Sequence, residues 1–115
     1  MKKTVINGVN YYPHSNGGGL VAETATVSET AYIGPNARVH KQAKVSDNAE
    51  VSDNAEISGQ AVIGNNAKVF GNAIISGQAV ISGRAKVSGD ERISSNIKVT
   101  GNSKIFDYRR FTANT

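Results

Sequence analysis

Cysteine and tryptophan are absent from this 115-residue chain, and leucine occurs only once. Without cysteine the chain has no disulfides and no thiolate metal sites, and it fits a reducing compartment. Nothing resembles a signal peptide, because Asn7, Gly8 and Asn10 interrupt the segment after the basic start. No apolar run is long enough to span a bilayer. We therefore expect one small cytoplasmic domain without a membrane partner.

A repeat of six residues dominates the rest of the chain. Alanine occupies every sixth position from Ala25 to Ala85, and Val or Ile occupies every sixth position from Val21 to Ile105. Asn, Asp and Gly gather in the two residues before each alanine from Ala49 to Ala79, where tight turns need left-handed backbone angles. The period suits one short strand plus one turn per hexad. It predicts an all-β solenoid.

Three hexads, 18 residues, close one triangular coil, so about five coils are expected over 19–105. Each aliphatic residue points inward, and alanine fills the corner. The predicted inner columns are β-branched throughout, which suits stacked strands. They are Val21, Val39, Ile57, Ile75, Ile93; Val27, Val45, Ile63, Ile81, Val99; and Ile33, Val51, Val69, Val87, Ile105.

Both ends of the chain lie outside the repeat. Asn7-Gly8 is a strong hairpin signal, so residues 1–18 are expected to form a hairpin cap and an entry segment. Residues 106–115 are bulky and amphipathic and predict a C-terminal cap. Glu91 and Arg109 would share one corner of successive coils and form an ion pair there. A nucleic-acid-binding basic tail is the less favoured alternative.

The hexad Val45-Ser46-Asp47-Asn48-Ala49-Glu50 resembles the motif of the hexapeptide-repeat family, and the resemblance covers about four-fifths of the chain. It implies a left-handed parallel β-helix that assembles as a homotrimer. The opening from Asn16 to Ala22 also looks like short hexapeptide-repeat proteins of bacteriophage and bacterial genomes. That resemblance suggests a bacterial host cell, and either capture of a nucleotide signal used in antiviral defence or a structural fibre segment.

A lysine column is the best candidate for chemistry. Lys68, Lys86 and Lys104 lie 18 residues apart and would stack on one outer face, with Phe70 beside them. Stacked like charges repel, and an anion between them would relieve the repulsion. With a ring for stacking, the set suits a phosphate-bearing small molecule such as a nucleotide. The alternative is that the lysines only keep the face soluble.

Val62 and Val80 form the most telling apolar feature outside the core. They would stack on an outer face, with Gly64 beside them, where most outer residues are polar. We interpret them, with Ile74, as candidates for a contact between copies of the chain. The alternative is that isolated surface valines need no explanation.

Catalysis is the weaker hypothesis. Hexapeptide-repeat acyltransferases use a histidine base beside a cleft, and only His14 and His40 occur here. His40 would be the base if the chain were an acyltransferase using acyl-coenzyme A. No loop interrupts the hexads, so we favour a non-catalytic binder without cofactor or metal. Asp47-Asn48 and Asp53-Asn54 fall in different corners and are read as turns.

Overall fold

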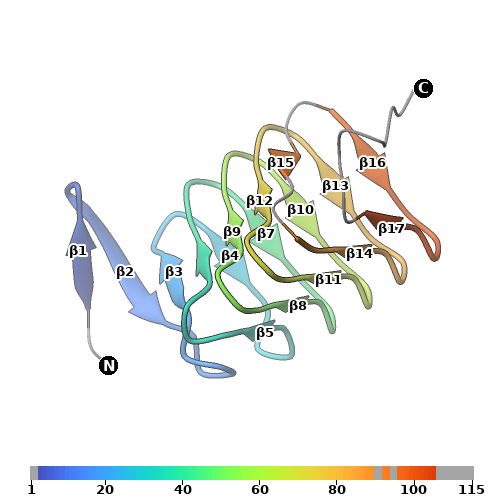
Figure 1. Ribbon diagram of the computed structural model, residues 1–115. Coiled ribbons are helices and arrows are strands. Elements are labelled where there is room, and N and C mark those ends of the chain that lie inside the picture. The colour runs from blue at the N-terminus through green and yellow to red at the C-terminus, as the bar shows by residue number, and fades with distance from the viewer. Residues whose placement is uncertain (1–2, 90–91, 94–95, 106–115) are drawn as a thin grey trace.

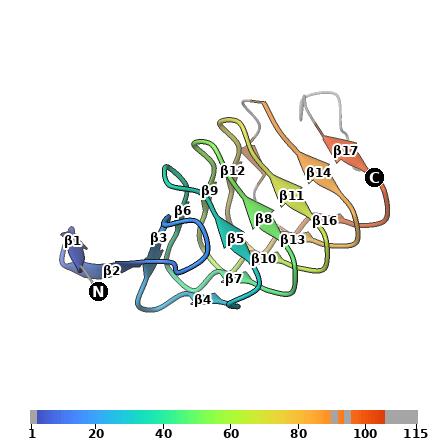
Figure 2. The same ribbon diagram turned by 90° about the horizontal axis from the view of Figure 1, so that it is seen from below.

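The computed structural model describes residues 3–89, 92–93 and 96–105, and every regular element among them is a strand (Figure 1). β1 (Thr4–Ile6), β2 (Val9–Pro13) and β3 (Leu20–Ala22) open the chain. Short strands then follow at the spacing of the hexads and stack into a three-sided β-solenoid of about five turns (Figures 1 and 2). The predicted fold class is confirmed; its left-handed sense remains an implication of the family resemblance.

Each side of the solenoid is one sheet, which we name face A, face B or face C. Face A continues from β3 through β6 (Arg38–Val39), β9 (Glu56–Ile57), β12 (Ile74–Ile75) and β15 (Arg92–Ile93). Face B consists of β4 (Thr26–Val27), β7 (Lys44–Val45), β10 (Val62–Ile63), β13 (Val80–Ile81) and β16 (Lys98–Val99). Face C consists of β5 (Tyr32–Ile33), β8 (Glu50–Val51), β11 (Lys68–Val69), β14 (Lys86–Val87) and β17 (Lys104–Ile105).

Successive coils pair in parallel and keep the 18-residue register. Val62 pairs with both Lys44 and Val80, for example, and its backbone N–H donates to the carbonyl of Ala79 at 2.9 Å. This register stacks each inner residue on its equivalent in the next coil. From Ile33 onward the aliphatic residues of all three predicted columns are buried, as are the corner alanines from Ala31 to Ala85.

The turns follow from residues that accept positive φ. Asp47, Asp53 and Asn65 have φ of 57°, 55° and 56°, and Gly59 has a φ of 64°. A Cβ on Gly59 would lie 2.8 Å from the backbone N of Gly77 in the next coil. That corner therefore needs glycine both for its conformation and for close stacking.

The predicted hairpin is present and extends face A. β1 pairs with β2 around Asn7-Gly8, and β2 then pairs antiparallel with β3. The entry loop covers the start of face C, because the N–H of Ile33 donates to Asn16 and its carbonyl accepts from Gly19. Face B has no such cover among the described residues, since β4 is its end strand. Val27 of this strand, predicted inside, is accordingly only partly buried, and Val21 of β3 is partly buried as well.

The predicted C-terminal cap, residues 106–115, and the predicted ion pair between Glu91 and Arg109 lie outside the described residues.

Candidate functional site

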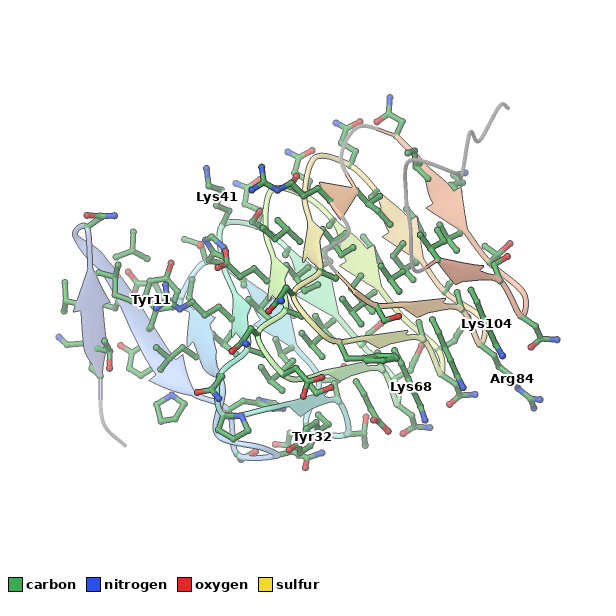
Figure 3. The ribbon with its side chains drawn as sticks, viewed as in Figure 1. Tyr11, Tyr32, Lys41, Lys68, Arg84 and Lys104 are labelled. Atoms are coloured by element: carbon green, nitrogen blue, oxygen red, sulfur yellow. The ribbon has the colours of Figure 1, made fainter. Side chains whose placement is uncertain are left out.

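Face C carries the lysine column. Lys68 pairs directly with Lys86, and Lys86 pairs with Lys104. All three side chains are exposed, and Figure 3 shows Lys68 and Lys104 on the same side of the solenoid as Tyr32. Paired strands lie about 4.8 Å apart, so the three ammonium groups repel through solvent. No carboxylate stands beside Lys86 in this column.

A carboxylate that was not predicted as part of the site precedes the column. Glu50 pairs with Lys68, and Tyr32 pairs with Glu50. The 18-residue spacing that revealed the lysines would also have revealed Glu50. The column thus changes sign along its length, with unbalanced positive charge only at Lys86 and Lys104. The positive charge of this column is therefore concentrated over the later coils.

Phe70 lies on face C one pleat away from Lys68, since Val69 between them points inward. It is half-buried, and its 18-residue neighbours in the outer column are Ser52 and Ser88. The small neighbours leave one aromatic ring between two hydroxyl side chains. The ring and the lysines share a face, as the sequence predicts, although they stand in adjacent columns.

Face B carries the valine pair. Val62 and Val80 are direct partners, with Lys44 on one side and Lys98 on the other. Gly64 follows on the same face, and a Cβ there would approach the Ser46 Oγ to 3.3 Å. The apolar pair is thus a short central segment between two exposed lysines.

Ile74 stands on a different side from the valines. It lies on face A between Glu56 and Arg92. A single flat contact through face B would not include it. Of the four predicted interface residues, the fold therefore brings together three.

A hollow of about 370 Å³ lies along face B at its corner with face A. This hollow was not predicted from the sequence. Its floor includes Val62, and its polar lining consists of Thr24, Thr26, Gln42, Lys44 and Gln60. Gln78 donates to Gln60 at 3.1 Å, and Gln60 donates to Gln42 at 3.3 Å. These glutamines lie 18 residues apart in the sequence, and that spacing would have predicted their stacking.

His40 lies on face A against the hairpin. Its Nε2 is 3.6 Å from Oε1 of Glu56, and its ring centroid is 6.4 Å from that of Tyr11. Burial lowers the pKa of His40 below 6.5, while the charge of Glu56 opposes that shift and Lys41 and Arg38 reinforce it. The Nε2 is buried, and among the described residues no group, Glu56 included, lies within hydrogen-bond distance of it. A base for catalysis needs access to substrate, which this packing restricts.

His14 holds the entry loop in place. Its Nε2 lies 2.9 Å from the carbonyl oxygen of Ala31. Among residues 3–89, 92–93 and 96–105 there is no group of three or more His, Cys, Asp or Glu side chains placed to hold a metal ion. The same residues include no helix that could cross a membrane.

Comparison with protein families, with characterised proteins and with solved structures returned no match to this chain. The class of protein is therefore defined by the fold alone, a three-sided β-solenoid with one cationic and one partly apolar face.

Proposed function

We propose that this chain is a non-catalytic, self-associating protein that binds a small anionic ligand between its subunits. The observation that carries the proposal is the unbalanced charge of Lys86, which has a lysine on each side in register. An anion that bridges two such ammonium groups removes their repulsion and adds charge-assisted hydrogen bonds. Phe70 on the same face suits a ligand with an aromatic base, so a nucleotide fits this site.

Self-association is supported by matching heights on faces B and C. Each coil rises about 4.8 Å, so height along the solenoid follows residue number. Phe70 falls nearly midway between Val62 and Val80, and Glu50 stands about 1.6 Å from Lys44 in height. In a ring whose symmetry axis parallels the solenoid, residues at equal height meet. Face B of one copy would then oppose face C of the next, with Lys44 near Glu50 and Phe70 between the two valines. Lys98 would stand at a similar height to Lys104, a repulsion that an anion in the cleft would relieve.

This arrangement would place the lysine column at the edge of a cleft between copies. A face B to face C contact is heterologous, and a closed ring satisfies every copy. The ring proposed here is a homotrimer, as the family resemblance implies. Such a cleft would serve to capture a nucleotide signal. This is the role expected of a phage protein that counters antiviral defence.

Native mass spectrometry of the purified full chain tests both parts. We expect an oligomer that binds a nucleotide such as ATP, and loss of that binding in Lys68→Ala/Lys86→Ala with the oligomer retained. Arg92→Ala, which removes an exposed cation of face A outside the proposed cleft, is the matched control. Equal binding by the double variant would overturn the ligand site.

A charge exchange tests the pairing of the two faces. Lys44→Glu and Glu50→Lys should each weaken association, and the double variant should restore it, because the attraction is then rebuilt with reversed signs. Monomeric wild-type chain at micromolar concentration would contradict the subunit cleft. Binding of the nucleotide to the lysine column of a single chain would then be measured separately.

A further inference from the structure

Face B begins with a strand edge that no other part of the described chain covers. The N–H groups of Thr26 and Ser28 donate to the carbonyls of Ala43 and Val45 in the next coil, at 3.0 and 2.9 Å. Because bonding directions alternate along a parallel strand, the N–H of Val27 points the opposite way. The carbonyls of Ala25 and Val27 point with it. These groups form the open edge of β4.

A hollow of about 410 Å³ lies beside this edge. Its apolar surface includes Val21, Ala25 and Val27, which are only partly buried, and Tyr12 and Pro13 of β2 form one wall. In the next coil the equivalent residues Val39, Ala43 and Val45 are completely buried. The first coil thus exposes core-type residues next to unpaired backbone groups.

Two carboxylates border the same hollow. Glu23 and Glu29 line it and are exposed. Glu23 accepts a hydrogen bond from Asn10 at 3.3 Å, and within the described part of the chain neither carboxylate has a salt bridge with Lys or Arg. An open edge, an aliphatic floor and an acidic rim together suit an extended peptide with large apolar and basic side chains.

We propose that this end binds residues 106–111 of a second copy of the chain. The segment reads Phe106-Asp107-Tyr108-Arg109-Arg110-Phe111, with three aromatic side chains and two arginines. Its aromatic rings match the apolar floor, and its arginines match Glu23 and Glu29. In an extended conformation its backbone would supply the hydrogen-bond partners that the N–H and C=O groups at the edge of β4 lack.

The partner must be another copy because of distance. Residue 105 ends β17 in the last coil, whereas β4 lies in the first, at the opposite end of the solenoid (Figure 1). The stack between them is about 20 Å long, and six extended residues span about 20 Å at most. They cannot both cross that length and lie along the edge. The contact joins the end of one solenoid to the start of the next.

Such a contact is heterologous and leaves a free site at each end of the pair, so it adds copies in a line. It is separate from the proposed contact between faces B and C, which matches copies at equal height.

The test is binding of a labelled peptide with the sequence of residues 104–111 to the full chain carrying Arg109→Glu/Arg110→Glu. These substitutions disable the chain's own segment and leave the site intact. We expect saturable binding by fluorescence anisotropy. Adding Glu23→Lys/Glu29→Lys to the same chain should weaken the affinity about tenfold or more, because attractions become repulsions. Absence of saturable binding would overturn the proposal, as would unchanged affinity.

A backbone variant separates strand pairing from charge attraction. Val27→Pro removes the unpaired N–H and is compatible with an edge position, whereas Val27→Ala keeps it and removes a similar apolar surface. We expect Val27→Pro to weaken the peptide more than Val27→Ala does, with circular dichroism confirming that both chains fold. Equal affinities for the two variants would show that the peptide does not extend the sheet.

Discussion

Face B presents Val62 and Val80 at the hexad positions where face C presents Lys68 and Lys86. Beneath them the two faces are alike, since Ile63 and Val69 are both fully buried and both faces use the same parallel register. The inward residue of each hexad is therefore constrained, whereas the residue before it is free to change. The fold is encoded on the inside and any function on the outside.

Truncation of the buried residues should have the largest effect and should not distinguish the faces. Ile63→Ala removes a buried side chain between two coils and is expected to cost about 2–5 kcal/mol of unfolding free energy. Val69→Ala removes fewer atoms and should cost somewhat less. Urea denaturation followed by circular dichroism measures both. The matched outer variant Val62→Ala should cost less than about 1 kcal/mol, and an equal loss there would break the comparison.

Exchange of the outer residues should affect association more than folding. Val62→Lys/Val80→Lys gives face B a continuous lysine column, and we expect the proposed oligomer to dissociate because charge replaces its apolar centre. Sedimentation velocity measures the change in mass. Lys68→Val/Lys86→Val on face C is the informative counterpart. If both double variants keep the wild-type mass, these faces are not the contact.

The sequence predicted the repetitive part of this molecule well because each hexad has the same environment. Period six placed every inner aliphatic residue from Ile33 onward, and the spacing of 18 placed Lys68 on Lys86. The sequence predicted the burial and packing of residues near the ends of the solenoid less well. The partial exposure of Val27 depends on what lies above β4, which no hexad specifies. The packing of His40 against Tyr11 depends on where the hairpin lies, and that position is set by the pairing of β2 with β3.

The charge pattern within face C gives a smaller and more local prediction. Lys86 has a lysine on each side, whereas Lys68 has Glu50 on one side. Lys86→Glu would make the column alternate in sign, and we expect it to stabilise the chain by about 0.5–1 kcal/mol at low salt. Lys68→Glu places a carboxylate beside Glu50 and should give less or nothing. Urea denaturation of both variants decides, and the difference should shrink in 1 M salt.

Face A supplies the smallest effect, a dependence of stability on pH through His40. Burial lowers the pKa of His40 in the folded chain below its ordinary value of 6.5. The unfolded chain therefore binds a proton as the pH falls through 6.5, while the folded chain still keeps the ring neutral. As the pH falls through that window, the free energy of unfolding should decrease, and it should level off below the pKa of His40 in the folded chain.

His40→Gln should remove this part of the pH dependence, and Glu56→Gln should widen the window. The second expectation follows because the Glu56 charge raises the pKa of His40 against the effect of burial, so its loss leaves burial, Lys41 and Arg38 acting together. Urea denaturation between pH 5 and pH 8 measures both slopes, with His14→Gln as the control for the other histidine. If wild type and His40→Gln give parallel curves, His40 does not contribute to the dependence.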